Sequence, residues 1–362
     1  MNQLRLVNIE TYNKDGFKSY RIPGIVVSRK GTIIVYYETR LSVADDWSAR
    51  GIGMKRSTDQ GKTFSQRKML VSDPGITINN PVMIASQDGR IHFLWQKDYR
   101  QLFYQVSLDD GLTFSEPVSL LDTVKAFKQE YCWSLFGIGP GHGIELRRGR
   151  LVVPIWLACG EGNNHYPTQV STLISDDGGT TWECGEIIYS GEKEGDDFLW
   201  VNESQAVELS DGSVLMNMRH NGQNRYRYTT VSPNGQSQFS KPVPDKQLPD
   251  AICFGSIIRD QEGNILFVNC ANNQAVQKNG WPERKNLTVK ISYDDAKTWS
   301  YARQLAEVGG YADMAVSPDG KRYYCFFEEG HPIDNLDPAN LTLAIFGEAY
   351  MTEGISLNHL IE

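Results

Sequence analysis

Short apolar runs recur along the whole chain, separated by clusters of glycine and polar residues. Runs such as GTIIVYYE, RIHFLWQ, RLVVPIWL, GSVLMNM and NILFVNC are rich in β-branched and aromatic residues and are bounded by turn-forming residues. Runs of this length and composition predict β-strands joined by tight turns. No long stretch repeats its apolar residues with the period of a helix, so we predict an all-β protein.

A polar motif returns between these runs, in which serine, aspartate, glycine and threonine alternate with variable residues before a terminal Phe or Trp. Its copies start at Ser57, Ser107, Ser175 and Ser292, with a degraded copy at Ser232. The aspartate can accept hydrogen bonds from turn N–H groups, the glycine permits positive φ, and the aromatic residue can pack between sheets. A period of about sixty residues over this length predicts one six-bladed β-propeller of four-stranded antiparallel blades, spanning residues 1–362 as a single domain.

Composition narrows the classes of partner. The net charge of −8 disfavours a nucleic-acid partner, because phosphate binding needs a basic surface. No run is long enough to span a membrane, and the six cysteines form no CxxC pair that would indicate a zinc site. We therefore expect a monomer with neither metal nor cofactor. The first residues lack a signal-peptide core, which predicts a cytoplasmic protein, or an exported one if a signal peptide has been removed.

The repeats are similar to the Asp-boxes of sialidase-type propellers, and the segment YRIP at Tyr20–Pro23 resembles the signature with which exo-sialidases enter their first blade. In that family three arginines grip the carboxylate of the sugar. The resemblance implies that Arg21 is the first, Arg219 at the end of GSVLMNMR the second, and Arg284 in PERKNLTV the third. The chemistry is reasonable, because a planar guanidinium matches a carboxylate with two parallel hydrogen bonds.

The same resemblance implies the reacting groups. Tyr311, after a Gly-Gly pair, matches the family's nucleophile, and Glu203 matches the general base beside it. A neutral phenol avoids the repulsion that a carboxylate nucleophile would meet at a sugar carbon already bearing a carboxylate. Asp45 matches the general acid, although a shift of one residue would give that role to its neighbour Asp46.

Further residues are implied at or beneath the sugar pocket. Arg40 and Glu38 match positions that support the arginines, while Asn80 and Trp156 match positions at the pocket itself. Trp156 stands where relatives carry a tyrosine, so the sequence leaves undecided which sugar is preferred. His142 invites a catalytic interpretation, but its Gly-Pro-Gly-His turn favours a structural role.

The resemblance runs from Arg21 to about Glu328 and implies a retaining exo-α-sialidase that acts on sialylated glycans. Two alternatives remain at this point. The enzyme could be a hydrolase or transglycosylase for a related sugar, either the deaminated nonulosonic acid or an eight-carbon keto sugar acid. The chain could also be a non-catalytic propeller that binds sialoglycans, although such a protein would have no need to keep both the tyrosine and the glutamate.

Overall fold

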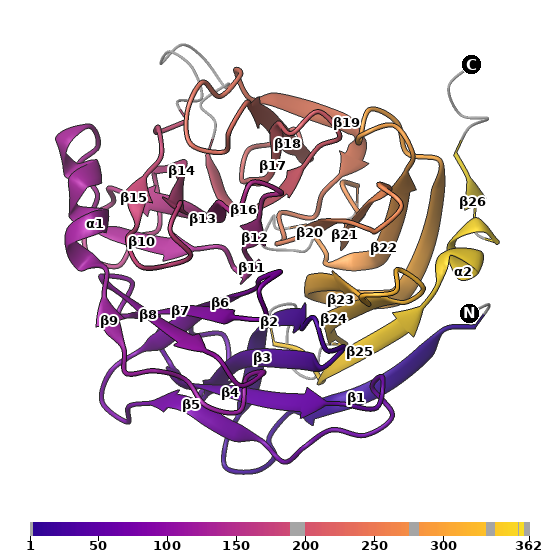
Figure 1. Ribbon diagram of the computed structural model, residues 1–362, viewed down its shortest axis with the longest axis horizontal. Coiled ribbons are helices and arrows are strands. Elements are labelled where there is room, and N and C mark those ends of the chain that lie inside the picture. Colours follow the sequence, from indigo (N-terminus) through magenta and orange to yellow (C-terminus); the bar gives the residue numbers. More distant parts are fainter. Residues whose placement is uncertain (1–2, 189–199, 275–281, 331–336, 354, 358–362) are drawn as a thin grey trace.

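A computed structural model of the chain describes residues 3–188, 200–274, 282–330, 337–353 and 355–357. Within these residues the regular structure is almost entirely β, and the predicted all-β class is confirmed. The helical elements described are α1 (Leu121–Lys125), α2 (Glu348–Thr352) and a 3-10 turn at Ala126–Gln129. Each described α-helix has five residues, too few to traverse a bilayer. The sheets are arranged around a central axis (Figure 1).

Most strands pair antiparallel with their neighbours in the chain, in runs of four. The chain forms β2 (Ser19–Val27), β3 (Ile33–Arg40), β4 (Ala49–Ser57) and β5 (Lys68–Ser72). It continues with β6 (Ile78–Ala85), β7 (Ile91–Lys97), β8 (Gln101–Ser107) and β9 (Val118–Ser119). The next run holds β10 (Leu135–Ile138), β13 (Leu151–Ala158), β14 (Thr168–Ser175) and β15 (Glu183–Cys184). After it come β16 (Val201–Glu208), β17 (Val214–His220), β18 (Tyr226–Ser232) and β19 (Val243–Pro249).

The last strands close the ring of sheets. These are β20 (Ser256–Arg259), β21 (Ile265–Cys270), β22 (Lys285–Ser292), the long β23 (Tyr301–Val316), β24 (Tyr323–Glu329) and β25 (Asn340–Phe346). The first half of β23 pairs with β22 and its second half with β24. The N-terminal strand β1 (Arg5–Thr11) pairs with β25, so the first strand and one of the last strands lie in one sheet. Short strands β11 (Gly141–His142), β12 (Ile144–Glu145) and β26 (Ile355–Ser356) lie beside β6, β13 and β23.

The five copies of the polar motif join the third strand of a run to its fourth. In the first copy the Asp59 carboxylate accepts hydrogen bonds from the backbone N–H and the hydroxyl of Thr63, at 2.9 and 2.6 Å. Gly61 has a φ of 78°, where a side chain would be strained. The degraded copy keeps the turn, because the side-chain oxygen of Asn234 accepts from two backbone N–H groups. The turn chemistry predicted from the sequence is confirmed.

The aromatic residue that ends the motif packs into the core. Trp182 and Trp299 are 6% and 2% exposed, and each belongs to a cluster of buried apolar side chains. Such clusters combine side chains from neighbouring groups of four strands. One cluster, for example, contains both Val26 of β2 and Phe93 of β7. The sheets therefore stabilise one another face to face, and no single run has a core of its own.

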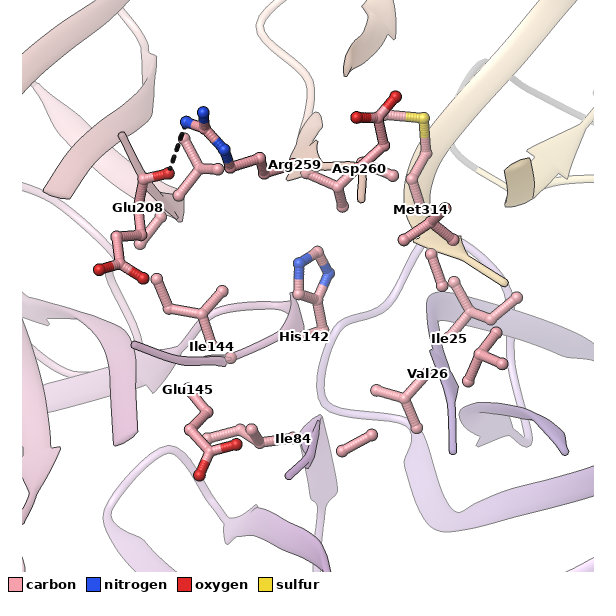
Figure 2. A pocket seen from close by; sticks show the side chains of 18 of the residues that line it. Ile25, Val26, Ile84, His142, Ile144, Glu145, Glu208, Arg259, Asp260 and Met314 are labelled. Carbon is pink, nitrogen blue, oxygen red and sulfur yellow. Dashed lines mark hydrogen bonds between the residues drawn. The ribbon is translucent and has the colours of Figure 1, made fainter. Parts of the chain in front are cut away.

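Strands β2, β6, β16, β20 and β23 line the central axis. A hollow of about 340 Å³ lies among their later residues, including Val26, Ile84, Val207, Ile258 and Met314. Figure 2 shows the imidazole of His142 pointing into this hollow. Arg21, Glu203 and Tyr311 occur earlier in β2, β16 and β23. A strand rises about 3.3 Å per residue, so the hollow and the predicted site lie toward opposite ends of the axis.

Candidate active site

Tyr311, Glu203 and Arg219 lie together although they come from three different strands, β23, β16 and β17. The Tyr311 hydroxyl donates a hydrogen bond of 2.5 Å to Oε1 of Glu203. Nη1 of Arg219 donates to the Tyr311 hydroxyl at 2.7 Å and to Oε2 of Glu203 at 2.5 Å. The predicted tyrosine–glutamate pair is thus placed with a hydroxyl proton already directed at a carboxylate.

Bulges in the axial strands direct these side chains inward. Regular pairing is interrupted at residues 21–24 of β2, 79–82 of β6, 201–204 of β16 and 309–312 of β23. These interruptions include Arg21, Asn80, Glu203 and Tyr311. A bulge bends its strand and re-aims a side chain, and bulges are common next to active sites. Prolines follow Ile22 and Asn80, in positions where the missing N–H costs no ladder hydrogen bond.

The three predicted arginines surround Tyr311. The guanidinium carbons of Arg21 and Arg284 lie 5.3 and 5.1 Å from the centre of its ring, and Arg219 contacts its hydroxyl. All three arginines are at least nine-tenths buried. Burial raises the pKa of Tyr311, against the opposing effect of Arg219, so the phenol stays protonated in the resting site. Within the described part of the chain, Nη1 of Arg284 is buried without a hydrogen-bond partner.

Glu328 of β24 is a site residue that the sequence reasoning missed. Its carboxylate accepts two hydrogen bonds from Arg21, at 2.9 and 3.2 Å, and one from the backbone N–H of Tyr311 at 3.1 Å. Burial opposes ionisation of Glu328, but the guanidinium of Arg21 outweighs it and lowers the pKa. A Cβ on Gly310 would lie 2.4 Å from this carboxylate, so glycine is required there. The sequence feature that could have indicated Glu328 is the pair of acidic residues at the end of the apolar run YYCFF.

The two adjacent aspartates, Asp45 and Asp46, lie in different surroundings. The Asp45 carboxylate is held within its own loop, where it accepts from the Ser42 hydroxyl and from the backbone N–H of Trp47. Asp46 instead pairs with Arg40 at 3.0 Å. The Asp46 side chain is half exposed, and its partial desolvation opposes ionisation, but the guanidinium groups of Arg40 and Arg21 outweigh this and lower its pKa. A tight turn sends neighbouring side chains in different directions, and here it is Asp46 that lies within reach of the arginines.

Arg40 and Glu38, which were predicted to support the arginines, form a buried ion pair. The guanidinium of Arg40 donates to Oε2 of Glu38 from both Nη2 and Nε, at 2.7 and 2.9 Å, and both side chains are buried. Glu38 also accepts from the backbone N–H of Asn80 at 2.8 Å. Asn80 therefore contributes its main chain to this network. Because Arg40 bonds to Glu38 on one side and Asp46 on the other, it determines where the Asp46 carboxylate lies.

Aromatic rings border the site on the side of Asp46. We call Trp47, Tyr99, Trp156 and His165 the aromatic wall. The His165 ring centre lies 4.9 Å from that of Tyr99 and 5.3 Å from that of Trp156. Burial lowers the pKa of His165, so its imidazole is neutral at neutral pH. Trp156, predicted at the pocket, is only 4% exposed and therefore shapes the pocket mainly through the rings that it supports.

His142 is not part of this group. It lies in the hollow of Figure 2, and its Nδ1 is 2.7 Å from a carboxylate oxygen of Asp313. Asp313 also accepts from the Ser256 hydroxyl and the backbone N–H of Ile25. This network joins several axial strands, in agreement with the structural role predicted for His142. No described group of three or more His, Cys, Asp or Glu side chains is arranged to hold a metal ion.

The family model for the BNR repeat-like domain matches residues 79–324. The chain belongs to this family. The match contains the motif copies that start at Ser107, Ser175, Ser232 and Ser292, together with Glu203, Arg219, Arg284 and Tyr311.

Curated relatives confirm the resemblance to sialidases. A sialidase of Micromonospora viridifaciens is 27% identical over 370 residues, which cover 92% of this chain and 53% of that protein. The chain thus spans about half the length of this relative. Other relatives of bacterial, fungal and animal origin also carry the name sialidase or exo-alpha-sialidase.

Solved structures share the fold. A Hadza microbial sialidase has a TM-score of 0.77 at 21% identity and covers 96% of this chain and 69% of its own. A leech intramolecular trans-sialidase, solved with 2,7-anhydro-Neu5Ac, has a TM-score of 0.76 at 16% identity and covers 96% of this chain and 71% of its own. The propeller-type fold predicted from the repeats is confirmed by these similarities.

Proposed function

We propose that this chain is a retaining exo-α-sialidase, which releases a terminal sialic acid from a glycan through a covalent intermediate on Tyr311. One observation carries the proposal. The Tyr311 hydroxyl donates to Glu203 and accepts from Arg219, while two more guanidinium groups flank its ring. A buried phenol with its own base, set among three arginines, suits attack on a carbon that bears a carboxylate.

The arginines would hold the substrate carboxylate. Arg219 and Arg21 already engage Glu203 and Glu328, which orients their guanidinium groups before substrate arrives. Arg284 retains an unpaired donor in the described structure. Guanidinium–carboxylate hydrogen bonds are strong when buried, and they would place the anomeric carbon over the Tyr311 oxygen.

In the first step the Tyr311 oxygen attacks the anomeric carbon, and its proton passes to Glu203. The bond from that carbon to the glycosidic oxygen breaks, and Asp46 gives its proton to the departing oxygen. In the second step Asp46 takes a proton from water, which attacks the same carbon. The bond to Tyr311 then breaks, and Glu203 returns the proton to the phenol. Two displacements at one carbon retain its configuration.

Asp46 replaces Asp45 in this mechanism because of where its carboxylate lies. In the empty site Arg40 and Arg21 lower its pKa, which favours the ionised form. A bound substrate carboxylate would offset the positive field of Arg21 and raise that pKa again. Substrate binding would thus help to protonate the group that must act as the acid.

The similar structures support the substrate class, since an intramolecular trans-sialidase of this fold has been solved with 2,7-anhydro-Neu5Ac and a sialidase with the inhibitor DANA. We also propose that the runs of four strands are the blades of a six-bladed propeller, with β1 completing the last one beside β25. The cytoplasmic location, the monomeric state and the extent of the domain over residues 1–362 stay predictions from the sequence.

The test is release of N-acetylneuraminic acid from an α-linked sialyl trisaccharide and from an aryl α-ketoside. Wild-type protein should hydrolyse both, and Tyr311→Phe should lose kcat on the order of 10³-fold or more. Tyr104→Phe is the matched control, because this buried hydroxyl bonds to His92 away from the site. The covalent intermediate should be trapped on Tyr311 by a fluorinated substrate and identified by mass spectrometry of its peptide.

No release of sialic acid from either substrate by wild-type protein would overturn the proposed activity. Turnover that survives in Tyr311→Phe, or a label found on another residue, would overturn the nucleophile and leave the activity in place.

A further inference from the structure

A buried ion pair lies behind the candidate site and has no part in the mechanism described above. Arg227 of β18 faces Asp250, which directly follows β19, and Nη1 of the arginine is 3.6 Å from a carboxylate oxygen. Both side chains are fully buried. A buried ion pair contributes little to stability by itself, because the desolvation of two charges offsets their attraction. The contacts that Arg227 makes on either side of the pair give a more specific reason for its place in the core.

One of these contacts reaches β17, the strand that carries Arg219. Nε of Arg227 donates a hydrogen bond of 2.7 Å to the side-chain oxygen of Asn217. Asn217 and Arg219 are two positions apart in β17, and alternate residues of a strand point to the same side of a sheet. Arg227 thus holds the face of β17 from which Arg219 donates to the Tyr311 hydroxyl.

The other contacts hold residues 250–255, which we call the supporting loop. Nη1 of Arg227 donates to the carbonyl oxygen of Cys253 at 2.8 Å, and the Asp250 carboxylate accepts from the backbone N–H of Cys253 at 3.3 Å. Ile252 has a φ of 53°, a conformation that a β-branched residue adopts only where its surroundings impose it. The ion pair therefore fixes the backbone of this loop from both of its charged groups.

The supporting loop places an aromatic ring against the nucleophile. Phe254 is fully buried, and its ring centre lies 5.6 Å from that of Tyr311, with the two planes inclined by 47°. A Cβ on Gly141 would lie 2.9 Å from the Phe254 ring, so this ring is closely packed where it meets Gly141. The guanidinium groups of Arg21 and Arg284 also border the Tyr311 ring. Phe254 adds apolar packing that limits how far the phenol can shift.

We propose that Arg227 is a positioning residue for the nucleophile and that it acts through Phe254. This inference rests on the proposed function. One guanidinium group bonds both to β17 and to the supporting loop, so it fixes the Tyr311 ring relative to the Arg219 donor. A shift of about 1 Å in a reacting group can lower a rate about 100-fold. Loss of the support should therefore slow the attack, while the arginines still bind the substrate carboxylate.

The experiment removes the pair without leaving one buried charge unpaired. The double variant Arg227→Met with Asp250→Asn replaces both charges by neutral side chains of similar size. The readout is the rate at which a fluorinated sialyl fluoride labels Tyr311, because this label reports the first displacement alone. We expect the maximal labelling rate to fall about 30-fold, with the half-saturating concentration within about threefold of wild type. The kcat for a sialyl trisaccharide should fall as well.

A second variant tests the contact with the nucleophile directly. Phe254→Leu keeps an apolar side chain but removes the ring from Tyr311, and it should lower the maximal labelling rate about tenfold. Combined with the double variant it should add little further loss, because both changes act through the same ring.

The matched control replaces another ion pair by the same residue types. Arg56 of β4 lies 3.1 Å from Asp110, which belongs to the turn of the second motif copy. The variant Arg56→Met with Asp110→Asn should leave the labelling rate and the half-saturating concentration within about twofold of wild type.

An unchanged labelling rate in a double variant that is less stable than wild type would show that the pair serves only the fold, and would overturn the proposal. A higher half-saturating concentration at an unchanged maximal rate would also overturn it, because the pair would then act on binding. Losses that multiply fully in the combined variant would exclude the route through Phe254. If the double variant does not fold, an unchanged rate in Phe254→Leu overturns the proposal.

Failure of the proposed function looks different from all of these outcomes. In that case wild-type protein would release no sialic acid and take up no label on Tyr311, and the positioning role would fall together with the activity.

Discussion

The two ends of the axial strands use charged side chains in different ways. Around Tyr311 three arginines converge, one donor of Arg284 has no described partner, and Asp46 is half exposed. Around the hollow of Figure 2 the charged groups are paired locally. Glu145 accepts from the backbone N–H of Gln87.

The other carboxylates of the hollow follow the same rule. Glu208 accepts from the backbone N–H of Arg147 at 2.8 Å, and Asp260 from the side chain of Asn264 at 2.9 Å. At the other end Arg21 and Arg219 have the carboxylate partners Glu328 and Glu203, but three guanidinium groups still converge on one phenol and a buried donor of Arg284 has no partner among the described residues. An excess of buried positive charge is costly unless an anion joins it. The difference indicates that one end is arranged for a ligand and the other for the integrity of the ring.

The largest expected effect is at the arginine end. Asp46→Ala should lower kcat on a sialyl trisaccharide about 10³-fold, because the leaving oxygen of a sugar needs a proton donor. Asp45→Ala is the matched neighbour and should lose less than tenfold, since its carboxylate only stabilises the loop. With an aryl ketoside, whose leaving group needs little protonation, the loss in Asp46→Ala should shrink. The reverse ranking of the two variants would return the acid role to Asp45.

At the opposite end the effect should appear in stability. His142→Ala removes the imidazole from the buried Asp313 carboxylate and should lower the free energy of unfolding by about 3 kcal/mol. Chemical denaturation measures this loss, and kcat of the folded variant should stay within threefold of wild type. His142→Asn keeps a donor for Asp313 and should recover part of the stability. A large fall in kcat with unchanged stability would contradict the division between the two ends.

A smaller effect is expected for a single member of the arginine group. Arg284→Ala should raise KM about 10- to 100-fold, because one charge-assisted contact to the substrate carboxylate is lost. Lys285→Ala is the control from the adjacent position, since this half-exposed lysine pairs with Glu283. Similar KM changes in both variants would mean that only the general positive charge matters.

The smallest effect concerns pH. Asp46 must be protonated to act as the acid. In the free enzyme desolvation raises its pKa, but Arg40 and Arg21 lower it by more. We therefore expect kcat/KM to fall as the pH rises above this lowered pKa. The substrate carboxylate offsets the field of Arg21 and raises this pKa in the complex. The kcat plateau should therefore extend about one pH unit higher than that of kcat/KM. Both profiles are measured from pH 3 to 8 on a natural glycoside. If the profiles of kcat and kcat/KM coincide, this coupling is contradicted.

Much of the fold was open to prediction because the motif is local. The hydrogen bonds of Asp59 stay within five residues of sequence, so the order of residue types in the motif is sufficient to recognise the turn. The tyrosine, the glutamate and the arginines were identified by their resemblance to a family, and the structure brings them together. Asp45 was preferred to Asp46 because spacing cannot show which way a loop residue faces. Glu328 was missed because it belongs to no recognisable motif.

By itself the sequence determined the strands, the repeated turns and the residue types available for chemistry, because strand periodicity and turn hydrogen bonds involve residues close together in the chain. The tertiary structure decided which side chains meet. Tyr311 and Glu203 are 108 positions apart, and their contact depends on bulges in two axial strands and on closure of the ring by β1 and β25. The support of Arg21 by Glu328, 307 positions away, also depends on that closure, because β2 and β24 meet only in the assembled ring.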